Sequence, residues 1–187
     1  MRADLRIAIL SFMALVVPPV AAKDPANRTS PAEVVRQYCQ FDMNGARLSS
    51  QSLYADKIDA LVTWPVEPGW DSAVLVGGFI VVRAHPGQHI SNVAVRYTVL
   101  GQMAASRVTA ATHPGGDLVT FVLVKSGNEW KIKRPLIPPH VSIQAAASNL
   151  RSLLNGEKDP QRRNALEHAL GVLNRLQHVG QIGTSSR

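Results

Sequence analysis

The sequence predicts an α+β fold in which N-terminal helices pack on a curved antiparallel sheet, followed by a C-terminal helical hairpin. A helix-start signal at residues 30–33 opens a segment with apolar residues at helical spacing. From Ala73 to Lys133, apolar residues alternate or run together between short turns that contain glycine, which is typical of antiparallel hairpins. After Pro138, helical spacing returns in two segments separated by Gly156.

The N-terminal helices are predicted from capping signals. Ser30 is expected at the N-cap, Pro31 at the first helical position and Glu33 in a capping box, and Gly45 is expected to end this helix. A second helix is predicted from about residue 50 to Leu61. Prolines and a glycine between residues 64 and 70 predict a loop after it.

The strands are predicted from residue 74 onward. The nearly continuous apolar run 74–82 predicts a strand covered on both faces, with a bulge or bend at Gly77-Gly78. A strand is expected at 93–100. Two more are expected at about 106–112 and 118–125, joined by a turn at residues 114–117. After a turn at 126–129, residues 130–133 are expected to close the sheet.

Residues 138–179 are predicted to form a basic helical hairpin. Ser142 is expected to cap its first helix and Gly156 to end it, whereas Asp159 and Pro160 are expected to begin the second. The short connection predicts antiparallel helices. Residues 180–187 are expected to be a flexible polar tail.

The first 22 residues have the pattern of a signal peptide. Arg2 and Arg6 supply positive charge, residues 7–17 are apolar apart from one serine, and Val20-Ala21-Ala22 offers the small residues that signal peptidase requires. Cleavage is expected after Ala22, followed by a polar lead-in at 23–29. The mature protein is expected to be periplasmic or secreted, without a later transmembrane segment; a retained N-terminal anchor is the alternative.

Positive charge is concentrated in the last third of the chain. Residues 23–124 hold eight Lys and Arg against eight Asp and Glu, whereas residues 125–187 hold ten against four. With a pI of about 10.1, this distribution predicts a solvated helix face, with weak contact with anionic surfaces as the alternative. No Phe, Trp or Tyr lies among the arginines of the C-terminal helices, which argues against specific nucleic-acid binding. The expected basic surface consists of Arg151, Arg162, Arg163 and Arg175.

Motifs for common chemistries are missing from the sequence. The single cysteine, Cys39, cannot form an internal disulfide and is expected to be a buried apolar side chain. His85 and His89 lack a third nearby ligand, so neither a metal site nor a bound cofactor is predicted. No Gly-x-Ser-x-Gly, Gly-x-Gly-x-x-Gly or P-loop motif occurs.

Three segments resemble the NTF2-like superfamily, with its cystatin-like α+β cone. They are Val34-Val35-Arg36-Gln37-Tyr38, residues 119–124, and the turn and strand 126–132 with Trp130-Lys131-Ile132. The resemblance implies a domain at 30–137 in which helices close one side of a curved sheet around a conical pocket. Enzymes of this superfamily are isomerases and dehydratases that use a pocket carboxylate. Between Ala73 and Asn128 the only acid is Asp117, so enzyme activity is disfavoured.

A binding role remains as the leading expectation. Tyr54, Trp64, Trp70 and Tyr97 are candidates to line a pocket, with Arg96 as a candidate to hold an anionic group. The expected function is an exported, non-catalytic protein that binds a small apolar or anionic ligand or a protein partner. The alternatives are a small pocket enzyme and a module that binds anionic surfaces through the C-terminal helices. The sequence leaves open whether the protein forms a homodimer.

Overall fold

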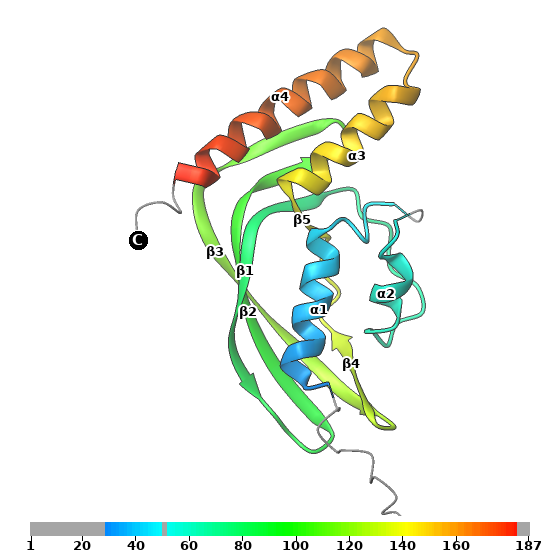
Figure 1. The fold of residues 1–187 in the computed structure, drawn as a ribbon, viewed down its shortest axis with the longest axis vertical. Helices are drawn as coiled ribbons and strands as arrows, with labels where there is room; N and C mark the ends of the chain where they lie inside the picture. Colours follow the sequence, from blue (N-terminus) through cyan, green and yellow to red (C-terminus); the bar gives the residue numbers. More distant parts are fainter. Residues whose placement is uncertain (1–28, 50–51, 183–187) are drawn as a thin grey trace, which may run out of the picture.

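The computed structural model describes residues 29–49 and 52–182, with the backbone alone for Pro114 and residues 178–182. Predictions on the signal peptide, the lead-in before Thr29 and the tail after Ile182 lie outside the described residues. Figure 1 shows the elements in chain order. They are α1 (Pro31–Met43), α2 (Ala55–Asp59), β1 (Ala73–His85), β2 (Ile90–Ala104), β3 (Arg107–Ser126), β4 (Glu129–Arg134), β5 (His140–Ser142), α3 (Ile143–Gly156) and α4 (Pro160–Ile182).

The strands form one curved sheet in the order β4-β3-β2-β1-β5. Neighbouring strands are antiparallel except β5, which runs parallel to β1 from Val74 to Val76. The predicted α+β class with two helices after the strands is therefore confirmed. The sequence reasoning missed β5, because its three residues follow a proline pair and are too few to show a period. Through β5, the segment after Pro138 joins the same sheet as the preceding strands.

The predicted turn at residues 114–117 is wrong, because one strand, β3, continues from Arg107 to Ser126. Both halves of β3 pair with β2: Ala110 lies opposite Gly101, and Gly115 lies opposite Val99. Residues 111–114 therefore form a large bulge facing a single residue of β2. Pro114 has no N–H to donate to a ladder, so it fits such an unpaired position. Bulges of this kind bend a sheet, and the sheet curves strongly here (Figure 1).

Two cores lie on opposite faces of the sheet. On the concave face, α1 packs on Val76, Tyr97 and Phe121. At the bent end, α3 and α4 pack on the other face, over Leu75 and Met103. Adjacent residues of β1 thus serve different cores, as side chains alternate across a strand. In Figure 1, α1 consequently lies inside the curve of the sheet, whereas α4 lies across the outer side of its bent end.

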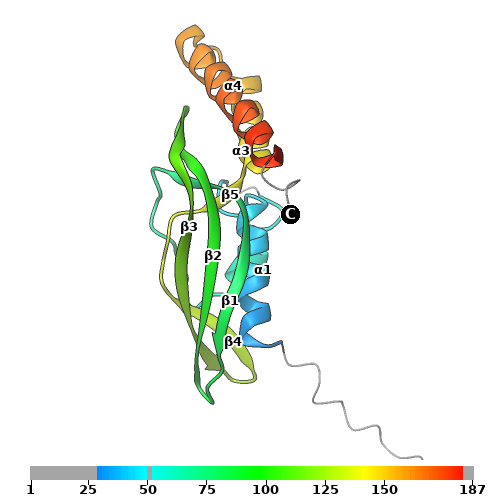
Figure 2. The same cartoon turned by 90° about the vertical axis from the view of Figure 1, so that its left-hand side faces the viewer.

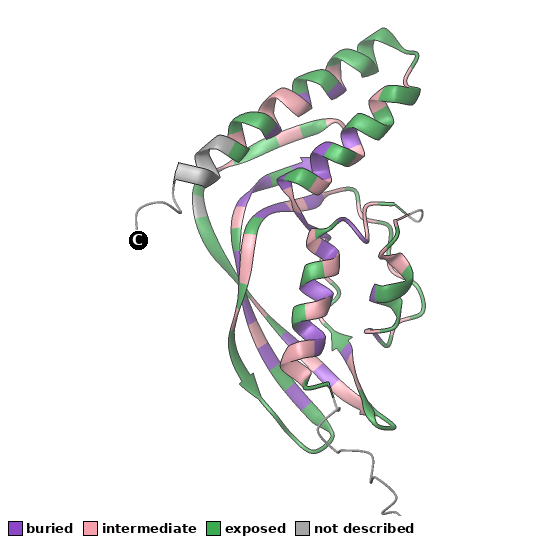
Figure 3. Cartoon of the chain, in the orientation of Figure 1, coloured by how far each residue is buried: buried purple, intermediate pink, exposed green. Residues whose placement is uncertain are grey.

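The prediction that strand 74–82 is covered on both faces is wrong for its second half. Ile80 is 58% exposed and Val82 is 43% exposed. Ile80 pairs with Arg96 on the convex face turned away from α1, which we call the outer face. The second half of β1 is largely exposed, beyond the part that the helical hairpin covers (Figure 3). The bulge predicted at Gly77-Gly78 is confirmed by register shifts between Leu75 and Gly78.

The predicted N-caps are confirmed, although Glu33 does not complete the capping box, because its carboxylate accepts from Arg36 and Gln37. The hydroxyl of Ser30 accepts the N–H of Glu33, and that of Ser142 accepts the N–H of Ala145. Asp159 accepts the N–H of Gln161 at the start of α4. The second helix is shorter than predicted, because turns around Ser52 precede α2. The last helix is longer and extends to Ile182, into the predicted tail.

The bend gives a test by glycine substitution. A Cβ at Gly101 would lie 2.3 Å from the carbonyl oxygen of Thr109, whereas a Cβ at Gly78 has no neighbour within 4 Å. We expect Gly101→Ala to lower the free energy of unfolding by about 2 kcal/mol, because backbone must shift, and Gly78→Ala to stay within about 1 kcal/mol of wild type. Urea denaturation measures both. Equal effects would show that the strands do not approach closely at Gly101.

Candidate functional site

Arg47 is the centre of a buried polar network. Its side chain is 5% exposed and donates to four acceptors on three segments. Nε donates to Glu67 at 2.8 Å, and Nη1 donates to the Tyr38 hydroxyl at 2.8 Å and to Asp42 at 3.2 Å. Nη2 donates to the carbonyl oxygen of Ile137. The guanidinium thus joins α1, the loop before β1 and the segment before β5.

The end of α1 places Arg47 in this position. Gly45 has a φ of 84°, which favours glycine. The N–H of Gly45 donates to the carbonyl of Asp42, and the N–H of Ala46 donates to that of Phe41. These bonds form a Schellman motif, which reverses the chain direction after the helix. The next residue, Arg47, is thereby turned back against Asp42.

Asp42 is fully buried and connects α1 to β5. Its Oδ2 accepts the backbone N–H of His140 at 2.8 Å as well as the Arg47 bond. Burial raises the pKa of Asp42 to about 7, and Arg47 opposes that rise. Oδ1 has no hydrogen-bond partner among the described residues. A carboxyl with a pKa near neutrality resembles a general base, but Asp42 is 0% exposed and cannot reach a substrate.

A second buried group extends from this network into the core. The Tyr97 hydroxyl and the Cys39 thiol form a hydrogen bond of 3.0 Å, and the His140 ring lies 4.3 Å from the Tyr97 ring. Burial raises the pKa of Cys39 to about 12, so the thiol stays neutral. Burial also lowers the pKa of His140, whose Nδ1 lies 2.8 Å from the Pro138 carbonyl oxygen. These residue types occur in active sites, but here they are closed off from solvent and serve the core.

A cavity of about 520 Å³ lies beside the Arg47 network. Its walls come from the loop after α1, from α2, from the loop before β1, from the turn after β2 and from α3. The lining residues are Ala46, Arg47, Leu48, Ser49, Ala55, Ile58, Asp59, Pro65, Glu67, Pro68, Gly69, Trp70, Asp71, Ser72, Ala73, Met103, Ala105, Pro139, Asn149 and Leu153. A second hollow of about 390 Å³ shares Leu48, Ser49 and Asn149 with it.

Glu67 fixes the loop that forms one wall of the cavity. Its carboxylate accepts from Arg47, from the indole of Trp64 at 3.2 Å and from the indole of Trp70 at 3.4 Å. Both indoles are therefore held by the same side chain that pairs with Arg47. Trp70 lies in the cavity wall, so a rigid aromatic surface faces the hollow.

The cavity wall carries more negative than positive charge. It includes Asp59, Glu67 and Asp71, but among cationic side chains only Arg47. Four hydrogen bonds already occupy the Arg47 guanidinium, so it has little capacity to hold a ligand anion. The remaining lining is largely apolar.

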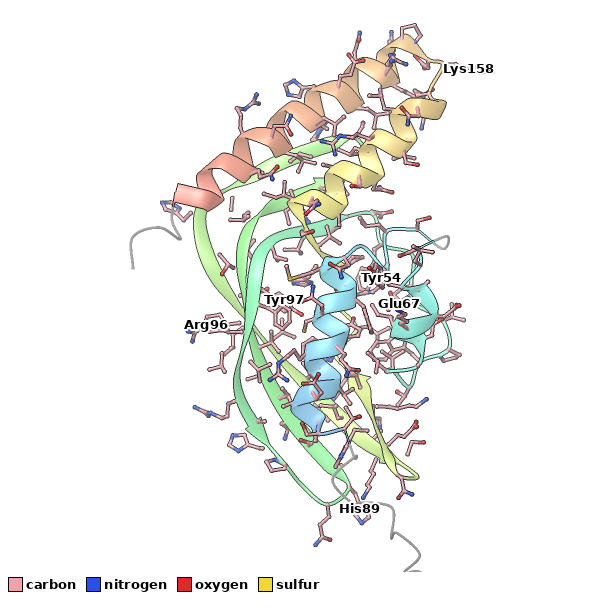
Figure 4. All side chains as sticks on the ribbon, viewed as in Figure 1. Tyr54, Glu67, His89, Arg96, Tyr97 and Lys158 are labelled. Atoms are coloured by element: carbon pink, nitrogen blue, oxygen red, sulfur yellow. The ribbon has the colours of Figure 1, made fainter. Side chains whose placement is uncertain are left out.

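The structure does not bring the five predicted ligand-binding residues together. Tyr97 is fully buried in the core, whereas the exposed Arg96 lies on the outer face of the same strand (Figure 4). Tyr54 stacks on Phe41 and lines the second hollow. Trp64 and Trp70 share Glu67, but only Trp70 lines the large cavity. Core side chains fill the concave side of the sheet, where the conical pocket was expected.

Sequence reasoning missed Asp42, Arg47 and Glu67. An arginine two residues after a helix-ending glycine is a signal that could have suggested a side chain folded back on the helix. Nothing in the sequence pairs Arg47 with Glu67, because that contact depends on where the 64–70 loop lies.

The predicted basic surface on the helical hairpin is partly neutralised. Arg151, Arg162, Arg163 and Arg175 are all exposed, as predicted. However, Arg162 pairs with Glu157 at 3.5 Å and Arg163 pairs with Glu167 at 3.3 Å. Four of the ten cations after residue 124 lie instead on the β3–β4 hairpin: Lys125, Lys131, Lys133 and Arg134.

Across residues 29–49 and 52–182, no three metal-binding side chains cluster, and no helix has the length and apolarity that crossing a bilayer requires. Comparison with protein families, with curated proteins and with solved structures finds no significant match to this chain.

The Arg47 network gives a prediction about stability. Replacing Arg47 with Met leaves the buried Asp42 and the partly exposed Glu67 without their cation, so we expect a loss of about 3–5 kcal/mol in the free energy of unfolding. Arg36→Met is a matched control, because Arg36 pairs with Glu33 on the exposed face of α1 and should cost at most about 1 kcal/mol. Urea denaturation of both variants tests this. A cost for Arg47→Met no larger than the control would show that Arg47 is not the centre of the network.

Asp42 gives a prediction about pH. Its folded-state pKa, about 7, lies above its ordinary value of 3.8, so the folded protein binds this proton more tightly than the unfolded chain does. The stabilisation is fully present below pH 3.8 and is lost as the pH rises through about 7. We therefore expect the stability of wild type relative to Asp42→Asn to fall between these values and then level off. A relative stability that rises with pH would mean that Arg47 lowers the pKa of Asp42 more than burial raises it.

Proposed function

We propose that this chain is an exported, non-catalytic binding protein whose ligand site is the cavity beside Arg47. The observation that carries this proposal is a hollow of about 520 Å³ with a wall built from the Arg47–Glu67 ion pair and Trp70. Binding pockets are commonly apolar hollows with a few fixed polar groups. A wall held by buried ion pairs before the ligand arrives reduces the entropy cost of binding.

The charge of the cavity favours a ligand with an apolar body and a cationic head. Three carboxylates line the hollow, and its one arginine is already hydrogen-bonded to protein groups. An aromatic face such as that of Trp70 also attracts cations. The ligand class proposed here is therefore a small organic cation or a basic side chain of a protein partner, in place of the anion that Arg96 suggested.

Burial argues against the enzyme alternative. Asp42, Cys39 and His140 have the chemistry of acid, nucleophile and base and lie near one another, but each is at most 3% exposed. None of them lines the cavity. Asp59 and Asp71 are among the carboxylates that line the cavity. The cavity wall contains no buried base or nucleophile beside them.

An NTF2-like relationship remains part of the proposal. The support for it is the arrangement of α1 against the concave face of a bent antiparallel sheet that ends in the β3–β4 hairpin at Trp130. The candidate site differs from the expected one, because it lies beside the cone, between α2 and α3, and not inside it.

Two ligands with the same ring and opposite charge test the proposal. We expect benzylamine to shift the NMR signal of the Trp70 indole N–H in a saturable way, and benzoate to leave it unchanged. Trp70→Phe identifies that signal among the three tryptophans of the chain. If benzoate binds and benzylamine does not, the site prefers anions and the proposed cationic ligand is wrong.

A cavity-filling pair separates the site from nonspecific binding. Ala55 lines the cavity, whereas Ala60, at the other end of α2, is exposed and does not. We expect Ala55→Phe to weaken benzylamine binding at least tenfold by occupying the hollow, and Ala60→Phe to leave it unchanged. Equal binding by both variants, or no binding of either probe to wild type, would contradict a ligand site in this cavity.

A further inference from the structure

The outer face below the helical hairpin carries a set of cations with no acid among them. Strand register places Arg96, Arg83, Arg134 and Lys131 on this face. The face consists of five cross-strand rows, and each of the last four rows contains one of these cations. The rows consist of Gly78, Thr98 and Gly116; Ile80, Arg96 and Leu118; Arg83, Ala94 and Thr120; His85, Asn92, Val122 and Arg134; and Ile90, Val124 and Lys131. None of these residues is acidic.

The nearest acids point elsewhere. Asp117 pairs with Tyr97, whose side chain lies in the concave core, and its charge acts on the buried His140. Glu129 lies at the turn of the β3–β4 hairpin. The rows of the outer face therefore hold four cations and no acid; Arg83 and Arg96 come from the segment 23–124, which is neutral as a whole.

Large aliphatic side chains lie among these cations. Ile80 and Ile90 are each 58% exposed, Leu118 is 57% exposed and Val82 is 43% exposed. Ile80 and Leu118 flank Arg96 in one row. The stem of Arg96 lies flat across Gly116, since a Cβ there would lie 2.9 Å from Arg96 Cδ. No described helix covers this part of the sheet, which faces the viewer in Figure 2.

We propose that the outer face of the sheet is an interfacial binding surface for anionic lipid bilayers. Cations near a bilayer surface are attracted by anionic headgroups, and exposed aliphatic side chains gain by entering the boundary between headgroups and acyl chains. Both features share one face here, and no acid opposes them. The charge fits an anionic partner, and the aliphatic side chains fit one with an apolar layer.

Nucleic acid fits this surface less well. Single strands bind proteins through aromatic side chains that stack on bases. The outer face rows contain no Trp, Tyr or Phe. Phosphate contacts alone would leave four exposed aliphatic side chains in water.

The test uses the chain from Lys23 onward, which keeps every described residue. Sedimentation with vesicles of phosphatidylcholine, or of phosphatidylcholine and phosphatidylglycerol in equal parts, measures binding. We expect binding to the anionic vesicles only, with Arg83→Gln/Arg96→Gln/Arg134→Gln weakening it by roughly fivefold for each charge removed. The matched control, Arg151→Gln/Lys158→Gln/Arg175→Gln, removes three exposed cations from the helical hairpin and should bind as wild type does.

A second variant tests the aliphatic contribution. Ile80→Thr/Leu118→Thr keeps strand-compatible residues at exposed positions, so the fold is preserved. We expect it to lose the part of binding that persists at physiological salt, because salt screens the charges but not apolar burial. The proposal is overturned if anionic vesicles do not bind at low salt, if the hairpin control loses as much binding as the sheet variant, or if single-stranded DNA binds more tightly than the vesicles.

Discussion

The burial of one guanidinium group determines much of this structure. A buried charge is costly unless it is paired and hydrogen-bonded, and Arg47 meets that condition with acceptors from α1, from the 64–70 loop and from the segment before β5. Those segments are distant in sequence, so the arginine fixes their relative positions. The cavity of about 520 Å³ lies beside it, and the loop that Glu67 anchors forms one of its walls.

The sheet itself is held by two cores that share strands. On β1, Val76 packs in the α1 core and its neighbour Leu75 in the core of α3 and α4; on β2, Tyr97 packs in the first core and Met103, beyond a register shift, in the second. The bulge in β3 makes this arrangement feasible, because it bends the sheet and lets the helical hairpin cover only the bent end. The rest of the outer face is consequently exposed, including aliphatic side chains that a fully covered sheet would bury.

Local signals in the sequence predicted the fold class and most helix ends, because caps depend on a few adjacent residues. Ser30, Ser142 and Asp159 act as expected. The predicted turn at Pro114 failed because glycine and proline suit a bulge as well as a turn, and the choice depends on β2. The site was missed for a similar reason: Arg47, Asp42 and Glu67 become one network only through tertiary contacts. The apolar run 74–82 predicted burial, but the residues that cover a strand face cannot be read from the strand.

The two proposed surfaces lie on opposite sides of the molecule and have opposite charge. Asp59, Glu67 and Asp71 line the cavity on the side of α1 and α2, whereas Arg83, Arg96 and Arg134 lie on the outer face. In Figure 4, Glu67 and Arg96 lie on opposite sides of the sheet. An anionic bilayer attracts the cationic face and repels the acidic side, so the charges orient the protein as well as bind it. Bound in this way, the chain holds its cavity toward the aqueous phase, where a cationic ligand concentrated near the bilayer can reach it.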